Sequence, residues 1–120
     1  MSTAKLLSNR DIKVLNTFYW EYFSNMNREF VEEQIKSSKQ FLEEQYGIER
    51  IGIFGSFARN EQQDTSDVDI LIELGKPIGF EFMKIKYYLE EKLGISVDLV
   101  TKNALKPQLR EQILKEVIYQ

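Results

Sequence analysis

Apolar residues recur at helical spacing in four stretches of the chain, and this periodicity predicts four amphipathic helices. They are expected within residues 11–23, 28–46, 79–94 and 103–120. The face expected to be buried holds Val31, Ile35 and Leu42 in the second helix, and Phe82, Lys86, Leu89 and Leu93 in the third. Gly47 and Gly94 follow these two helices, in the position where glycine commonly ends a helix. A shorter helix is expected within residues 57–62.

Three further segments, residues 48–54, 67–74 and 95–101, have the composition of strands. Because side chains alternate along a strand, the middle segment has two different faces. One is apolar and suited to packing on helices (Val68, Ile70, Ile72, Leu74), and the other carries Asp67, Asp69, Leu71 and Glu73. The element order predicts one α+β or α/β domain with a small mixed sheet flanked by helices.

Composition narrows the class of protein. Apolar residues make up 42% of the 120 residues and charged residues 29%, which indicates a folded globular chain rather than a disordered one. No apolar run approaches the roughly 20 residues that span a bilayer, and no signal peptide is recognisable. We therefore expect a cytoplasmic protein without membrane contact. The net charge of −3 argues against direct nucleic-acid binding.

The absence of histidine and cysteine limits the chemistry that the chain can perform. Without histidine, acid–base work must fall to carboxylates, lysine or tyrosine. Without either residue, any bound metal is expected to be a hard, oxygen-ligated ion such as magnesium.

Two aspartates open the middle strand, although strands usually avoid aspartate. Asp67 and Asp69 share a face, and Asp98 in the last strand can reach the same patch if the two strands are neighbours. Three carboxylates in one place would raise one another's pKa values unless a cation neutralised them, which favours a divalent metal site. The alternative is that such aspartates bond only to turn backbone.

A small-residue turn precedes this strand. Gly55 allows the backbone to approach a ligand closely, and Ser56 is expected to cap the short helix that follows. Backbone amides there, with the Ser56 hydroxyl and Arg59, would form an anion site. An ordinary tight turn and a solvated arginine are the alternative interpretation. The glycine spacing and Gly-Lys-Ser/Thr ending of a Walker loop are missing.

"GSFAR", followed after six residues by "SDVDILIEL" and later by "ISVDLVTKNALKPQLREQILKEVIY", resembles the minimal nucleotidyltransferases of the DNA polymerase β-like superfamily. The resemblance covers about residues 48–119 and departs from the family at Asn60, where glycine is frequent. It implies the α+β polymerase β-like fold and transfer of AMP from ATP with release of pyrophosphate.

The resemblance also assigns roles to particular residues. Asp67 and Asp69 would bind two magnesium ions, and Asp98 would complete the second metal site and could take the acceptor's proton. The nucleotide-binding residues would be Gly55, Ser56, Arg59 and Ser66. Stand-alone minimal members act as antitoxins of HEPN/MNT toxin–antitoxin systems, which implies a HEPN-domain RNase as partner, modified on a tyrosine. A noncatalytic antitoxin that neutralises by binding, or transfer to RNA or a small molecule, stays open.

An N-terminal helical extension over residues 1–27 is expected to precede the catalytic domain over residues 28–120. Five aromatic residues fall within six positions of it: Phe18, Tyr19, Trp20, Tyr22 and Phe23. Aromatics on nearly all sides of a helix must be buried or used as a contact surface. Packing within the chain and a dimer or toxin interface are both compatible with this pattern.

Overall fold

The computed structural model describes residues 27–120. Their elements, in chain order, are α2 (Arg28–Tyr46), β1 (Ile48–Phe54), α3 (Gly55–Ala58), β2 (Val68–Leu74), α4 (Glu81–Leu93), β3 (Val97–Thr101), the 3-10 helix η1 (Lys102–Ala104), α5 (Pro107–Glu116) and β4 (Ile118–Tyr119). The helix predicted within residues 11–23 and its five aromatic residues lie outside this part of the chain.

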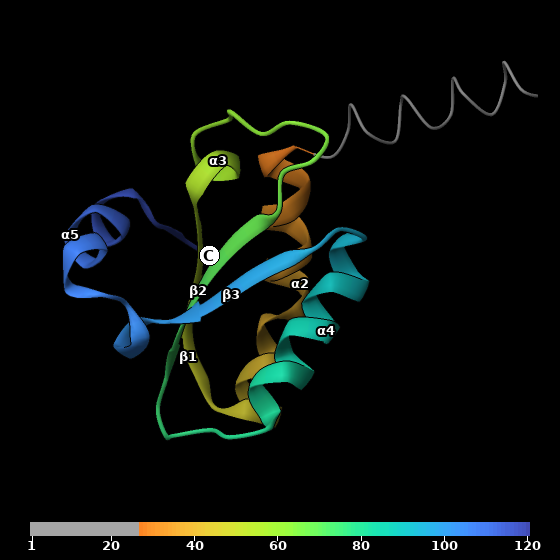
Figure 1. Ribbon diagram of the computed structural model, residues 1–120. Helices are drawn as coiled ribbons and strands as arrows, with labels where there is room; N and C mark the ends of the chain where they lie inside the picture. The colour runs from red at the N-terminus through yellow and green to blue at the C-terminus, as the bar shows by residue number, and fades with distance from the viewer. Residues whose placement is uncertain (1–26) are drawn as a thin grey trace, which may run out of the picture.

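A four-stranded mixed sheet forms the centre of the fold, in the order β3-β2-β1-β4. β1 pairs with β2 and with β4 in antiparallel fashion, whereas β2 and β3 run parallel. The helices α2 and α4 lie together on one side of the sheet, and α5 lies on the other (Figure 1). This arrangement confirms the predicted α+β fold with a small mixed sheet flanked by helices.

The hydrophobic core lies between the sheet and the pair α2 and α4. Val68, Ile70 and Ile72 of β2 are fully buried, as the predicted alternation of that strand requires. From the helices, the core receives Val31, Ile35, Leu42, Ile85, Leu89 and Leu93. The opposite side of β2 is therefore available for polar chemistry at its start.

Both long helices end where the sequence predicts. The Asn27 side chain accepts a hydrogen bond from the Phe30 backbone N–H at 3.0 Å, so that it caps the start of α2. Gly47 and Gly94 end α2 and α4 in the left-handed conformation. The predicted buried face of α4 was wrong at one position, because Ile85 is fully buried and Lys86 is only half-buried.

The largest difference from the sequence expectation lies at the C-terminal end. The predicted helix over residues 103–120 is instead η1, the ten-residue α5 and the short strand β4. Ile118 and Tyr119 leave the helix to pair with Ile53 and Gly52 of β1. A Cβ atom at Gly52 would lie 2.7 Å from Val117 Cγ2 and 2.9 Å from the Ile118 carbonyl oxygen, so this close pairing requires glycine.

Within residues 27–120, none of the helices is long and apolar enough to cross a membrane.

Replacement of Ile70 by alanine should lower the free energy of unfolding by about 2–5 kcal/mol, because it leaves a cavity in the core at a fully buried position. Urea denaturation followed by circular dichroism would measure the change. Leu109→Ala, at a position that is 49% exposed, is the matched control and should stay close to wild type. Equal losses for the two variants would contradict the packing described here.

Candidate active site

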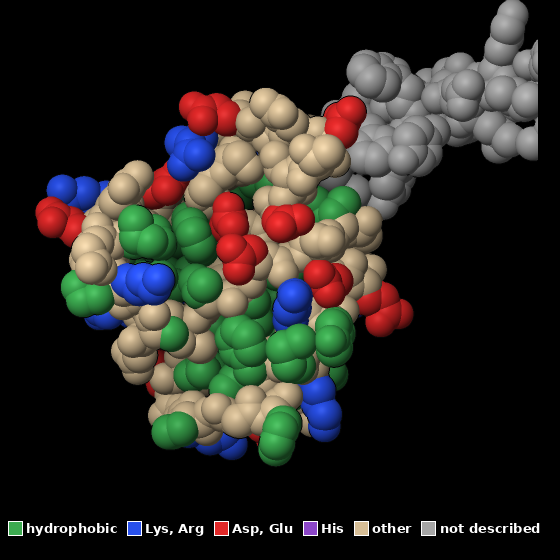
Figure 2. Space-filling view, viewed as in Figure 1, with side chains coloured by type: hydrophobic (Ala, Val, Ile, Leu, Met, Phe, Trp, Pro, Cys, Tyr) green, Lys and Arg blue, Asp and Glu red, His purple; other side chains and the backbone are tan. Residues whose placement is uncertain are grey.

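Two aspartates lie side by side on the face of the sheet opposite α2 and α4. In the parallel pairing of β2 with β3, Asp69 is in register with Asp98. Asp67 is exposed and immediately precedes β2, which begins one residue later than predicted. Figure 2 shows a group of acidic side chains near the middle of this face, above a group of apolar ones. The two strands that carry the aspartates, β2 and β3, are thus neighbours in the sheet, which is the condition that the expected cluster required.

Within this group, the ionised carboxylate of Asp69 is disfavoured by its surroundings. Burial raises the pKa of Asp69, and the carboxylates of Asp98, Asp67 and Glu116 raise it further, from 3.8 to about 6. Repulsion between neighbouring carboxylates has this effect when no cation offsets it. The site therefore carries more negative charge than its surroundings stabilise.

The turn between β1 and α3 lies directly against this group. Gly55 has φ +72°, and a Cβ atom there would lie 2.0 Å from Oδ2 of Asp69. Phe54, the residue before it, is in register with Asp69 across the antiparallel pair β1–β2. Position 55 therefore requires glycine for two reasons: the positive φ, and the close approach of the Asp69 carboxylate.

Two serines predicted to bind nucleotide have different surroundings. Ser56 lies inside the first turn of α3, which has no side-chain cap, so the prediction that it caps this helix was wrong. Ser66 is already engaged in its own loop, because its hydroxyl accepts a hydrogen bond from the Gln63 N–H at 2.8 Å. Of the two, Ser56 is the one placed in the turn that touches Asp69.

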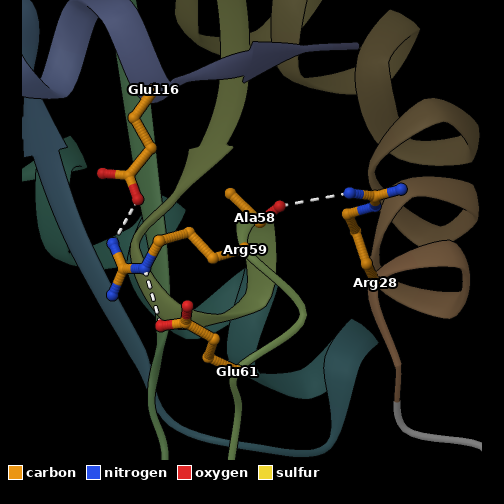
Figure 3. Close-up of polar contacts among 5 residues, drawn as sticks. All are labelled: Arg28, Ala58, Arg59, Glu61 and Glu116. Atoms are coloured by element: carbon orange, nitrogen blue, oxygen red, sulfur yellow. Dashed lines mark hydrogen bonds and ion pairs between the residues drawn. The ribbon is translucent and has the colours of Figure 1, made fainter.

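Arg59 ends α3 and points toward α5. Its Nε donates to Glu61 at 3.0 Å, and its terminal nitrogen forms an ion pair with Glu116 (Figure 3). Hydrogen bonds to Glu61 and Glu116 raise the pKa of Arg59. The arginine is therefore held beside the site by α5, an arrangement that the sequence did not predict.

The turn after Arg59 explains the one departure from the family pattern. Asn60 has φ +56°, the left-handed region in which glycine is the usual residue. Asparagine tolerates this region better than most side chains do, so the substitution keeps the turn.

A second arginine holds α3 from the opposite side. Arg28, the first residue of α2, donates from its guanidinium to the Ala58 carbonyl at 3.1 Å (Figure 3). A helix of four residues leaves its last carbonyls without partners inside the helix. Arg28 supplies one of the missing donors and ties the candidate site to the core helix.

Asp67, Asp69 and Asp98 do not by themselves form a complete set of metal ligands. Among residues 27–120, no three acidic side chains converge in a geometry that would already hold a metal ion. Magnesium in nucleotide sites is commonly bound by one or two carboxylates, with substrate phosphates and water as the other ligands. Asp67, Asp69 and Asp98 supply the hard oxygen donors that such an ion takes, and the raised pKa of Asp69 is the effect that a neighbouring cation would offset.

A cavity of about 830 Å³ opens at the other end of β2 and β3. Its lining includes Glu73, Lys102, Arg110, Asn103 and Phe82, and none of the residues predicted for the site. Glu73 lies four positions after Asp69, which is about 13 Å along a strand. The cavity is therefore a separate feature of the same sheet.

Glu116 is the residue near the site that sequence reasoning missed. It lies 18 residues beyond Asp98, at the end of α5. Its only sequence signal is that an acidic residue stands in the last turn of a helix. Such a residue opposes the helix dipole, which favours cations at that end. The chain brings it to the site because α5 ends there and β4 then pairs with β1.

Comparison with known proteins decides the family. Residues 35–120 match the family described as the nucleotidyltransferase domain. This chain belongs to the nucleotidyltransferase domain family. The resemblance identified from the motifs and the enzyme class that it implies, nucleotidyltransferase, are both confirmed.

Relatives of this nucleotidyltransferase agree in sequence and in structure. The protein adenylyltransferase MntA of Thermococcus cleftensis is 40% identical over 92 residues, covering 76% of this chain and 93% of the relative. A solved structure assigned as a minimal nucleotidyltransferase superimposes with a TM-score of 0.69 at 32% identity, over 79% of this chain and 97% of the other.

A complex of the tri-AMPylated Shewanella oneidensis HEPN toxin with an MNT antitoxin contains a chain of the same fold. Its TM-score is 0.57 at 18% identity, over 74% of this chain and 70% of the other.

Replacement of Gly55 by alanine should destabilise the nucleotidyltransferase by about 1–3 kcal/mol, because φ +72° strains a side chain and the new methyl group displaces Asp69. Thermal and urea denaturation would measure the loss. Gly79→Ala is the control, since a Cβ atom at Gly79 has nothing within 4 Å. If the two variants unfold alike, the close approach of Asp69 to the turn is wrong.

Asp69→Asn should change how stability depends on pH in the presence of EDTA. The folded state raises the pKa of Asp69 to about 6, so its proton favours folding below about pH 4, and this contribution is lost as the pH rises through about 6. The variant should therefore be more stable than wild type at about pH 8, with a difference that shrinks toward pH 4.

Denaturation midpoints across this pH range would test the pH prediction. Asp64→Asn, an exposed change in the loop before β2, is the matched control and should show no such trend. A difference between Asp69→Asn and wild type that is the same at pH 4 and pH 8 would contradict the raised pKa of Asp69.

Proposed function

We propose that this chain is a magnesium-dependent protein adenylyltransferase that transfers AMP from ATP to a tyrosine hydroxyl of a HEPN-domain toxin, and so acts as an antitoxin. The observation that carries the proposal is the register of Asp69 with Asp98, next to a glycine turn that fits closely against Asp69. Supporting it are the family membership of the chain and the names of its relatives.

In this proposal, Asp67, Asp69 and Asp98 hold two magnesium ions together with the phosphates of ATP. When bound, these ions would neutralise the carboxylates and the phosphate oxygens and stabilise the charge that develops at the α-phosphate. The raised pKa of Asp69 supports this assignment, because a carboxylate in that environment gains from a neighbouring cation.

The residues of the turn would bind the leaving group. Backbone N–H groups of Gly55 and Ser56, with the Ser56 hydroxyl, would donate to the terminal phosphates, and Arg59 would neutralise part of their charge. Ser66 would act from the neighbouring loop, once its hydroxyl turns from Gln63 toward the nucleotide.

The reaction is a displacement at phosphorus. The acceptor hydroxyl oxygen bonds to the α-phosphorus of ATP, the bond from that phosphorus to the bridging oxygen breaks, and pyrophosphate leaves with the bond's electron pair. The hydroxyl proton passes to a base, and Asp98 is the candidate because it is exposed beside Asp69 and the chain has no histidine.

The domain division stays part of the proposal: residues 28–120 would form the catalytic domain, and residues 1–27 an N-terminal extension. The expected cytoplasmic location and the absence of direct nucleic-acid binding follow from composition and charge alone.

Asn replacements at Asp67, Asp69 or Asp98 should each lower AMP transfer by about a hundredfold or more, the order of effect when one group stabilising a transition state is removed. Transfer of label from α-labelled ATP to the co-purified HEPN partner, with magnesium, would measure it. Asp64→Asn should label the partner as wild type does.

Unchanged labelling with the aspartate variants would overturn the proposed catalytic site. Protection of cells from the toxin by an unlabelled Asp67→Asn/Asp69→Asn variant would instead favour a noncatalytic antitoxin. Label on RNA or on a small molecule, with none on protein, would exclude the proposed acceptor.

A further inference from the structure

Glu116 is an acidic residue in surroundings that disfavour it. It lies in the last turn of α5, where the helix dipole favours a cation. Its side chain is only 19% exposed, and its charge acts on Asp69, which already has two acidic neighbours. Each of these conditions destabilises a carboxylate, so a favourable interaction elsewhere must offset them.

The one favourable partner of Glu116 among the described residues is Arg59. The two side chains form an ion pair between α5 and the end of α3, with the guanidinium between Glu116 and Glu61 (Figure 3). Glu61 is 65% exposed and two residues away along the chain, so it constrains the arginine weakly. Glu116 is the more buried and more distant anchor.

Glu116 also has a fixed backbone. The chain pairs with β1 immediately after it, through Ile118 and Tyr119, and the Gln120 N–H donates to the Ile51 carbonyl at 2.9 Å. β1 in turn leads directly into Gly55. The Glu116 backbone is therefore held close to β1, the strand that also positions the Gly55–Ser56 turn.

The geometry points to Glu116 as a positioning residue that holds the Arg59 guanidinium beside the Gly55–Ser56 turn, ready for the terminal phosphates of a nucleotide. The assignment rests on the proposed function, in which Arg59 contacts those phosphates. Without Glu116, the ion-pair partner left to Arg59 among the described residues would be the exposed Glu61.

The distinguishing property is selectivity for the terminal phosphates. If Glu116 acts through Arg59, its loss should weaken ATP binding by about tenfold, the scale of one charge-assisted hydrogen bond, and leave AMP binding within about twofold. A purely structural role would weaken both nucleotides, or neither.

The test is isothermal titration of the full chain with ATP and with AMP, each with magnesium, for Glu116→Ala, Arg59→Ala and the double variant. The expected result is that the double variant binds ATP within about twofold of Arg59→Ala, since the two residues act as one unit. Glu111→Ala is the matched control on the same helix, because Glu111 is exposed and pairs only with Lys115 among the described residues. It should bind both nucleotides as wild type does.

Glu116→Gln guards against a folding defect, because it keeps an acceptor for Arg59 without the charge, and it should weaken ATP binding by only about threefold. Melting temperatures of all variants would be recorded alongside.

If Arg59→Ala weakens ATP binding while Glu116→Ala and Glu116→Gln do not, the positioning role is wrong and the proposed function stands. If Arg59→Ala leaves ATP binding unchanged, the phosphate role of Arg59 fails, and the role of Glu116 with it. Additive losses in the double variant, or equal losses for ATP and AMP, would show a structural role and overturn the inference.

Discussion

The parallel pairing of β2 with β3 is the constraint on which the site depends. It places Asp69 in register with Asp98, and a slip of one residue would turn one of the two carboxylates toward the helices. The register is held from the other face, where buried apolar residues of both strands pack on α2 and α4. The core that stabilises the fold therefore also holds two like charges together, and burial and these neighbouring carboxylates together raise the pKa of Asp69.

The short helix α3 links the acidic group of Asp67, Asp69 and Asp98 to α2 and α5. A helix of four residues has little stability of its own, so its position is set by its neighbours. Arg28 holds its last carbonyl from α2, and Glu116 holds Arg59 from α5. Gly55 at its start lies against Asp69. The turn is thus fixed on three sides by parts of the chain that are far apart in sequence, which suits a site that must be formed before its ligand arrives.

Sequence reasoning succeeded where the deciding signal is local. Alternation along residues 67–74 separates the apolar face from Asp69, and Gly47 and Gly94 mark the helix ends at which the structure places them. Sequence reasoning failed where pairing between segments far apart in the sequence decides the local structure. Val117, Ile118 and Tyr119 form a short apolar run directly after α5, and pairing with β1 makes Ile118 and Tyr119 a strand. The partner of Arg59 depends on that same pairing, so Glu116 could not be found from spacing.

The electrostatics of the site connect these observations. Asp67, Asp69, Asp98 and Glu116 outnumber the one arginine among them, so the group as a whole repels a nucleotide that arrives without cations. Metal ions reduce that repulsion, and the phosphates supply the ligands that the carboxylates alone do not provide. In the proposed function, binding of the cation and of the triphosphate is therefore coupled, since each improves the affinity for the other by the same factor. Within such a site, an arginine kept apart from the metal ligands is more useful than one paired with them, because only the former remains available to the terminal phosphates.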